Sequence, residues 1–184
     1  MSLGRLLIVG AGGYGRTVAE AALLCGWDSI AFVDDGFPAV SWSGHYDVLG
    51  GSSTIARFAS EFDAAVCAVG NNQVRKSMTE LIEGAGLSLV SIIHPRAYVS
   101  TDALVGAGTT IMAGAVVGPY ARIGKGCILN ANATADHDSE MADYAHLGVG
   151  VAIAGTACLG EGAWLQAGRH AGYGVAVDDW EVWK

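Results

Sequence analysis

Two histidines and their acidic neighbours are the side chains of this sequence best suited to proton transfer. His137 lies between Asp136 and Asp138, and His146 follows nine residues later. A neutral imidazole can accept a proton near pH 7, which makes His137 the candidate general base. A neighbouring carboxylate can hold the other ring nitrogen and raise the basicity of the imidazole. The residue order leaves open whether Asp138 or Asp136 does so.

The histidines have two alternative interpretations. A zinc site needs three or more protein ligands. His137, His146 and His170 are separated by nine and twenty-four residues, and no acidic cluster completes a ligand set. The sequence therefore predicts no metal site. An isolated histidine at the edge of a repeat protein is usually a solvated surface residue, which is the alternative to catalysis.

A glycine-rich turn has the sequence features of a phosphate-binding loop. The apolar run 6–10 leads into GAGGYG at residues 10–15, directly before a predicted helix whose first N–H groups could bind phosphate. Asp34 and Asp35 come nineteen and twenty residues after Gly15, a spacing that suits hydrogen bonds to a ribose. The glycines could also serve only to make a tight strand-to-helix turn.

Four apolar runs in the first ninety or so residues predict a short parallel α/β sheet. The predicted strands are 6–10, 29–33, 64–69 and 87–93, and the predicted helices are 16–25 and 74–83. Ligands bind at the carboxyl ends of such strands, where the glycine turn and the sequence GNN at 70–72 both lie. A dinucleotide needs two βαβαβ halves and this region has room for about one, so a single nucleotide is a better match than a dehydrogenase cofactor.

The rest of the chain repeats every six residues. From Val99 to Trp183 every sixth residue is apolar, and a small residue precedes most of them by two places. Such a period is typical of a parallel β-helix in which three short strands make one coil. Fifteen positions predict five coils of eighteen residues, about 24 Å tall. On this pattern His137 falls on a turn and His146 points outward. The alternative fold, a β-sandwich, needs longer strands and irregular turns.

Composition and charge limit the other function classes. The chain has 184 residues, of which 52% are hydrophobic, enough for a substantial core. Its formal net charge is −8, and neither half has the basic face that nucleic acid would need. The four cysteines form no CxxC pair, which predicts reduced thiols. The apolar N-terminal run is too short for a membrane span and lacks a signal-peptide cleavage pattern, so we expect a cytoplasmic protein.

These motifs together resemble the bacterial sugar O- and N-acyltransferases of the hexapeptide-repeat superfamily, which include sialic acid O-acetyltransferases and nucleotide-linked amino-sugar N-acetyltransferases. The resemblance rests on GAGGYG, the DD pair, GNNQVRK, IIHPRAYVS and NANATADHDSEMADYAHLGVG. It implies a half-Rossmann-like nucleotide-sugar-binding domain over residues 1–94 and a left-handed parallel β-helix over residues 95–184. The implied assembly is a homotrimer with active sites between neighbouring β-helices.

The resemblance also implies an activity, the transfer of an acetyl group from acetyl-CoA to a nucleotide-linked amino sugar. Asp138 would orient the general base His137, and acetyl-CoA would contact His146, Gly155 and Ala167, with backbone N–H groups stabilising the oxyanion. The residues expected to bind the nucleotide sugar are Gly12, Gly13, Tyr14, Asp34, Asp35 and Gly70. An O-acetyltransferase acting on a sialic-acid-like sugar is one alternative. A non-catalytic nucleotide-sugar-binding trimer is the other, because family members usually continue through further coils that help to hold coenzyme A.

Overall fold

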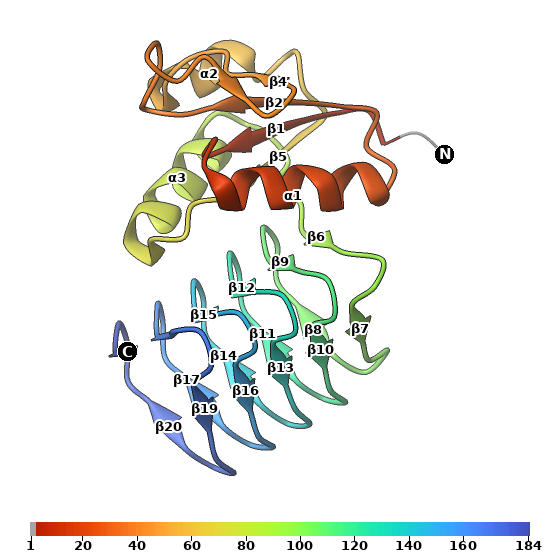
Figure 1. Ribbon diagram of the computed structural model, residues 1–184, viewed down its shortest axis with the longest axis vertical. Coiled ribbons are helices and arrows are strands. Elements are labelled where there is room, and N and C mark those ends of the chain that lie inside the picture. The colour runs from red at the N-terminus through yellow and green to blue at the C-terminus, as the bar shows by residue number, and fades with distance from the viewer. Residues whose placement is uncertain (1–2) are drawn as a thin grey trace.

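The N-terminal part of the chain is a three-layer α/β unit. In the computed structural model, which describes residues 3–184, strands β1 (Arg5–Val9), β2 (Ser29–Val33) and β5 (Ala64–Cys67) form a parallel sheet in the order β2-β1-β5 (Figure 1). Helix α1 (Gly13–Leu24) packs on one face, and α2 (Ile55–Phe58) and α3 (Asn72–Gly84) pack on the other. Between β2 and β5 lie the hairpin β3 (Trp42–Ser43) and β4 (Tyr46–Asp47) and the short 3-10 helix η1 (Ser52–Thr54).

The prediction of a fourth strand in this sheet, over residues 87–93, is wrong. In the segment 87–93, Leu89 forms only an isolated bridge to Ala65, held by two backbone hydrogen bonds of 2.8 and 3.0 Å. The chain then leaves the sheet, and β6 (Ile92–Ile93) pairs with β9 (Thr110–Ile111) in the repeat region instead. An apolar run marks burial but not the sheet in which a residue is buried, and here two layers compete for the same residues.

The repeat region is a parallel β-solenoid of about five turns, as the six-residue period predicts. Each strand is two residues long, and successive strands fall in three sheets. The first sheet contains β6, β9 (Thr110–Ile111), β12 (Ile128–Leu129), β15 (His146–Leu147), β18 (Trp164–Leu165) and β21 (Val182–Trp183). The second contains β7 (Tyr98–Val99), β10 (Val116–Val117), β13 (Thr134–Ala135), β16 (Ala152–Ile153) and β19 (His170–Ala171). The third contains β8 (Leu104–Val105), β11 (Arg122–Ile123), β14 (Glu140–Met141), β17 (Cys158–Leu159) and β20 (Ala176–Val177).

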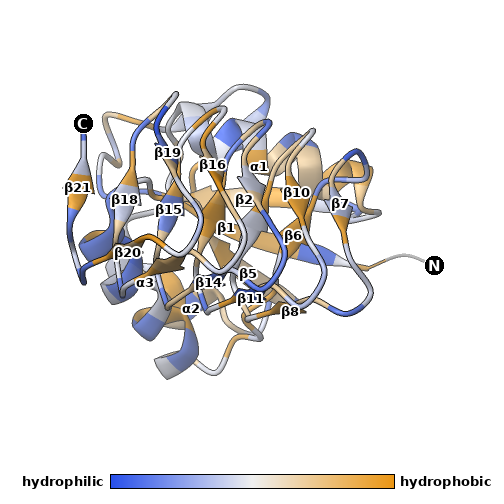
Figure 2. Ribbon diagram, turned by 90° about the horizontal axis from the view of Figure 1, so that it is seen from below, coloured by the Kyte–Doolittle hydropathy of each residue, from blue (hydrophilic) through white to orange (hydrophobic). Residues whose placement is uncertain are grey.

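Inward-facing side chains explain why the period is six. Val117 and Ala115 are fully buried, and the same two positions recur in the core from coil to coil. The strands β6, β8, β10 and β20 appear hydrophobic in Figure 2, and the turns between strands are more polar. A small residue is needed two places before the branched one because the chain bends sharply there, close to the axis of the coil. The handedness of the solenoid and the division at residues 94 and 95 stay predictions.

The α/β unit covers the first sheet of the solenoid, which we call the covered sheet; the second and third are the open sheets. In Figure 1 the α/β unit lies directly above the row β6, β9, β12 and β15. The outward residues of this row, such as Thr110 and Ile128, are buried, whereas Tyr98 and Leu104 at outward positions of the open sheets are exposed. Within residues 3–184, no helix has the length and hydropathy needed to cross a bilayer.

Candidate active site

The candidate base lies on an exposed turn of the solenoid. His137 is in the middle of the turn 136–138 that joins β13 to β14, at the edge where the two open sheets meet. Its Nδ1 atom is 2.8 Å from Oδ2 of Asp138, and about half of each side chain is exposed. Asp136 instead accepts a hydrogen bond from the backbone N–H of His137, at 2.7 Å. Of the two carboxylates, only that of Asp138 contacts the ring.

This contact sets the acid–base properties of the imidazole. The hydrogen bond that the ring N–H donates to Asp138 raises the pKa of His137, and the charges of Asp136 and Asp138 act in the same direction. With Nδ1 directed at Asp138, the lone pair of the neutral ring is on Nε2, the atom that could accept a proton. The geometry therefore fixes Nδ1 against Asp138 and leaves Nε2 available to accept a proton.

Gly155 lies directly beside this free nitrogen. It occupies the matching turn one coil further on, and a Cβ atom built on it would be 2.5 Å from both Nε2 and Cε1 of His137. The turns are tied together because the Thr156 N–H donates to the His137 carbonyl at 3.1 Å. The absence of a side chain at Gly155 is what leaves room for the imidazole ring beside the next coil. Tyr173, another coil on, lies 6.5 Å from the His137 ring between centroids.

His146 has a different environment from His137. It points outward from β15, as alternation predicts, but outward there means towards the α/β unit, and only 6% of the residue is exposed. Its ring stacks on Trp164 with centroids 5.1 Å apart, and neither ring nitrogen has a hydrogen-bond partner within the part of the chain described. Burial, followed by the nearby charge of Arg75, lowers the pKa of His146 to about 3, against a smaller opposing effect of the nearby Gly70 backbone, so the ring is neutral.

The residues expected to bind acetyl-CoA are therefore spread over the surface of a single chain. Gly155 adjoins His137 at the junction of the open sheets, whereas His146 faces the α/β unit. Ala167 is exposed on the turn 166–168, which leads from the covered sheet to the second sheet. One chain does not bring these three residues together.

A small pocket lies at the carboxyl ends of β1, β2 and β5, where the sequence predicts a nucleotide. Its volume is about 180 Å³, and its lining includes Gly10, Asp34, Asp35, Val69 and Val74. Asp34 uses one carboxylate oxygen for the N–H of Ala11, at 2.7 Å, and the other for the N–H of Gly36, at 2.8 Å.

The second carboxylate of the pocket is less occupied. Asp35 Oδ1 accepts from the N–H of Ser52 at 2.7 Å, and this hydrogen bond lowers the pKa of Asp35. The Ser52 side chain lowers this pKa further, so the Asp35 carboxylate is ionised near neutral pH. Asp34 holds the glycine turn in shape, and Asp35 is the better placed of the two for a ribose or base.

The glycine turn is open where a phosphate would approach. A Cβ on Gly12 would meet nothing within 4 Å, and no side chain caps the first turn of α1. Gly70 is equally open, on the turn between β5 and α3. Gly15 serves packing instead, because a Cβ there would collide with the carbonyl oxygen of Gly10. Free N–H groups at the start of α1 are suited to an anion.

Tyr14 points away from this pocket. Its hydroxyl is 2.6 Å from Oγ1 of Thr110 on the covered sheet, and burial raises its pKa to about 12. Gly13 lies on the open side of the same turn, with only an Arg16 atom within 4 Å of a built Cβ. Tyr14 therefore contacts the solenoid, and its contact with a nucleotide sugar stays a prediction. Among residues 3–184, no group of three potential ligands is placed to hold a metal ion.

Sequence reasoning missed Arg75, which is 1% exposed although it carries a charge. A lysine or arginine on a helix is usually solvated, so its presence alone gave no signal. The spacing of Asn72, Arg75, Thr79 and Ile82 on one face of α3 was the available signal, because Ile82 marks that face as buried.

Known proteins match the chain in both of its parts. Residues 5–82 match the family model described as PglD N-terminal domain, and residues 102–137 match the bacterial transferase hexapeptide model of six repeats. The UDP-N-acetylbacillosamine N-acetyltransferase of Bacillus subtilis (strain 168) is 48% identical over 46 residues, which are 25% of this chain and 21% of that protein. The match thus spans about a fifth of the length of that curated relative.

Two solved structures are similar over nearly the whole chain. A mutant of GDP-perosamine N-acetyltransferase from Caulobacter crescentus, in complex with CoA and GDP-perosamine, is 30% identical with a TM-score of 0.92, covering 98% of this chain and 86% of that one. The acetyltransferase domain of PglB from Neisseria gonorrhoeae FA1090, in complex with acetyl coenzyme A, is 30% identical with a TM-score of 0.83, covering 97% and 94%.

Proposed function

We propose that this chain, which belongs to the PglD-like nucleotide-sugar N-acetyltransferases of the hexapeptide-repeat superfamily, transfers the acetyl group of acetyl-CoA to the amino group of a nucleotide-linked sugar. The observation that carries this proposal is the His137–Asp138 pair, with Nδ1 held at 2.8 Å and Nε2 free beside Gly155. The relatives named above supply the substrate classes, CoA and a nucleotide-linked amino sugar.

The reaction needs a base because an attacking amine must lose a proton. Nε2 of His137 accepts this proton as the nitrogen attacks the thioester carbonyl, and the ring becomes an imidazolium that Asp138 stabilises. The new C–N bond forms, the C–S bond breaks, and the sulfur of CoA leaves with a proton returned from the imidazolium. The products are an N-acetylated sugar and free CoA.

The donor's carbonyl oxygen gains negative charge in this step. Gly155 lies next to the free nitrogen of His137, and we assign its backbone N–H as the candidate oxyanion donor. His146, neutral at any physiological pH, can donate one ring N–H to the thioester carbonyl, as the family resemblance implies. Ala167 completes the proposed acetyl-CoA contacts.

The acceptor binds to the α/β unit in this proposal. Asp35 holds the ribose or base in the pocket beside Asp34, and the open N–H groups at Gly12 and Gly13 bind the phosphates. Gly70, which directly follows the pocket residue Val69 on the turn after β5, is the remaining proposed acceptor contact. We accordingly assign acceptor binding to residues 1–94 and acetyl transfer to residues 95–184.

A homotrimer is part of the proposal. His137 is at the junction of the open sheets, and the α/β unit covers the opposite sheet of the same chain (Figure 1). A nucleotide sugar bound to one copy therefore needs the His137 of a neighbouring copy. Exposed apolar residues on the open sheets and their turns, among them Tyr98, Leu104 and Val116, provide a surface for such a neighbour.

A thiol-release assay tests the proposed function. The protein is incubated with acetyl-CoA and a panel of UDP- and GDP-linked 4-amino sugars, with the matching 4-hydroxy sugars as controls. We expect free CoA only with amino sugars. Release with the hydroxy sugars would indicate an O-acetyltransferase, and nucleotide binding without any release would indicate a non-catalytic binding protein.

Mixed oligomers test the shared site. His137→Ala removes the base, and Asp35→Ala removes a proposed acceptor contact, so each variant alone should be nearly inactive. Mixing the two by joint refolding or coexpression should restore part of the activity, because some interfaces pair an intact His137 with an intact Asp35. No recovery, together with a monomer in sedimentation, would contradict the shared site.

A further inference from the structure

Arg75 is a buried charge without an acidic partner. Arg75 is the largest of the fully buried side chains within residues 3–184. No carboxylate within the same residues forms an ion pair with it. Burial lowers the pKa of its guanidinium, since a charge is costly to remove from water. Such a side chain is tolerated only where hydrogen bonds satisfy its donors.

Backbone carbonyls supply those hydrogen bonds from both parts of the chain. Nη1 donates to the carbonyls of Val69 and Gly70, at 3.0 and 3.3 Å, in the turn between β5 and α3. Nε donates to Gly126 at 2.7 Å, and Nη2 donates to Tyr144 at 2.6 Å, in two successive coils of the solenoid. One guanidinium thus joins the turn beside the nucleotide pocket to the solenoid.

The solenoid carbonyls form a regular series. Gly126, Tyr144 and Gly162 are eighteen residues apart, and each has a left-handed backbone with φ of 61°, 62° and 63°. Arg75 binds the first two carbonyls, and Nδ2 of Asn72 donates to the third at 2.8 Å. The N-terminal half of α3 is therefore aligned with three consecutive coils through neutral backbone atoms.

We propose that Arg75 is a positioning residue for acetyl transfer, whose guanidinium holds the acceptor turn 69–71 at a fixed place relative to the coils that carry His146. The inference rests on the proposed function, because it assigns acceptor binding to that turn and donor contact to His146. Tyr144 precedes His146 by two residues. The same guanidinium therefore contacts the proposed acceptor turn through Val69 and the backbone next to the proposed donor contact His146 through Tyr144.

Arginine suits this role better than lysine. The planar guanidinium carries five N–H donors in a fixed fork, which can bind carbonyls on two sides at once. A lysine ammonium keeps the charge but is a compact point with three donors on a flexible stem. Arg75→Lys therefore removes the two-sided contact while changing charge and volume little.

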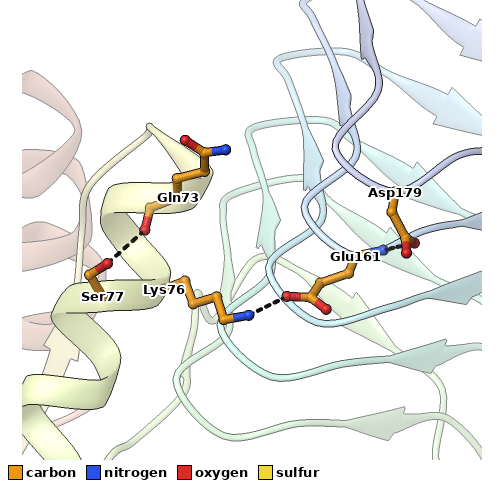
Figure 3. A network of polar contacts seen from close by, with 5 residues as sticks. All are labelled: Gln73, Lys76, Ser77, Glu161 and Asp179. Carbon is orange, nitrogen blue, oxygen red and sulfur yellow. Dashed lines mark hydrogen bonds and ion pairs between the residues drawn. The ribbon is translucent and has the colours of Figure 1, made fainter.

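The next residue along the helix offers a matched control. Lys76 also connects α3 to the solenoid, through an ion pair of 2.7 Å with Glu161, whose N–H in turn donates to Asp179 at 2.8 Å (Figure 3). Both side chains of this pair are more than a third exposed, and exposed ion pairs contribute little. Lys76→Met thus removes a cationic contact between the same elements without touching the buried fork.

Steady-state kinetics provide the first measurement, on the amino sugar that wild type acetylates. We expect Arg75→Lys to lower kcat about 10²-fold, because a shift of about 1 Å between bound reactants has that effect. The KM of each substrate should change less than about threefold, since each substrate's own contacts are intact. Lys76→Met should keep kcat and both KM values within about twofold. Rates are normalised to the stoichiometry of CoA binding by calorimetry, which removes any inactive fraction.

Amide hydrogen exchange provides a readout that does not depend on turnover. Arg75→Lys should speed exchange in three separate segments, residues 69–75, 126–127 and 144–146, and Lys76→Met should not. Should Arg75→Lys fail to fold, Asn72→Ala removes only the Gly162 contact, and a severalfold lower kcat with unchanged KM is then expected.

The outcomes separate the two proposals. Wild-type kcat in Arg75→Lys, or a loss that disappears on normalisation to bound CoA, would overturn the positioning role. If wild type releases no CoA with any of the acceptors tested, the proposed function fails. In that case faster exchange confined to these three segments still supports Arg75 as the link between the α/β unit and the solenoid, and unchanged exchange overturns it.

Discussion

The two histidines of the repeat region, nine residues apart, differ in every property that matters for proton transfer. His137 is half-exposed on a turn, and Asp138 raises its pKa. His146 is buried beneath the α/β unit, and its pKa falls to about 3. Groups whose environments move their pKa values apart commonly have different roles at one site. The first can exchange protons near neutral pH, and the second can only offer a neutral ring.

The solenoid itself does not create this difference. Both residues come from the same six-residue pattern, and His146 would be as exposed as other outward residues on an open sheet. The α/β unit creates it by covering one sheet of three, with α3 fixed there by Arg75 and Asn72. In this protein the α/β unit therefore changes the chemistry of a side chain on the solenoid.

The largest effect is expected from His137→Ala. The loss of a general base lowers kcat by about 10² to 10⁴, while CoA and nucleotide-sugar binding should change little. Thiol release measures the rate, and calorimetry measures the binding. The control is His170→Ala, which removes an exposed histidine from β19 on the same open sheet. A His137→Ala enzyme with normal turnover would contradict the assignment of the base.

A smaller but still large effect is expected from Gly155→Ala. The new Cβ would lie 2.5 Å from Nε2 of His137, so the ring must move. A displacement of about 1 Å predicts a loss of about 10² in kcat. Gly172→Ala is the matched control on the neighbouring coil, because a Cβ there makes only an ordinary contact of 3.8 Å with Val175. Equal kinetics for the two variants would show that the ring does not need its present place.

How far the sequence could predict the structure differs between these two regions. The solenoid was predictable because its period is local: Val117 and Ala115 face inward for the same steric reason as their equivalents in every coil. The turn position of His137 followed from the same count. Its contact with Asp138 rather than Asp136 did not, because it depends on the left-handed backbone of Asp138, with φ of 57°.

The covered sheet could not be predicted in this way. The contacts that place α3 join residues far apart, Arg75 with Gly126 and Asn72 with Gly162, separated by 51 and 90 positions. Alternation correctly predicted that His146 points outward, but not that another layer would bury it. For the same reason Tyr14, expected at the nucleotide, contacts Thr110 on the solenoid.

Asp138→Asn sharpens the comparison from the exposed side. The carboxylate raises the pKa of His137, so its removal lowers that pKa and leaves the ring neutral at lower pH. The rising limb of the pH–rate profile should therefore move to lower pH. The plateau should fall about tenfold to thirtyfold, because a charge-assisted hydrogen bond that orients the ring is lost. Asp136→Asn, which removes a carboxylate that does not contact the ring, should shift the limb less, and an identical shift would contradict the geometry.

His146→Phe tests the buried side, where rate and stability should change in opposite directions. Phenylalanine keeps the stack on Trp164 and removes two ring nitrogens that have no partner in the described chain, so stability at pH 7 should stay equal or rise by about 1 kcal/mol. If the ring donates to the thioester carbonyl, kcat should nevertheless fall about tenfold. Urea unfolding and thiol release measure the two quantities on the same preparation.

The acid side of the stability curve separates burial from catalysis. The folded-state pKa of His146, about 3, lies below its usual 6.5. Between these two pH values the unfolded chain therefore binds a proton at His146 and the folded chain does not. Wild type should therefore lose about 1.4 kcal/mol per pH unit from this residue as the pH falls from 6.5 towards 3, and nothing above 6.5. His146→Phe should remove that part of the slope, whereas His45→Phe, at an exposed position, should not. An unchanged slope in His146→Phe would mean that the α/β unit opens and lets the ring reach water, and the contrast between the two histidines would then be smaller than their burial indicates.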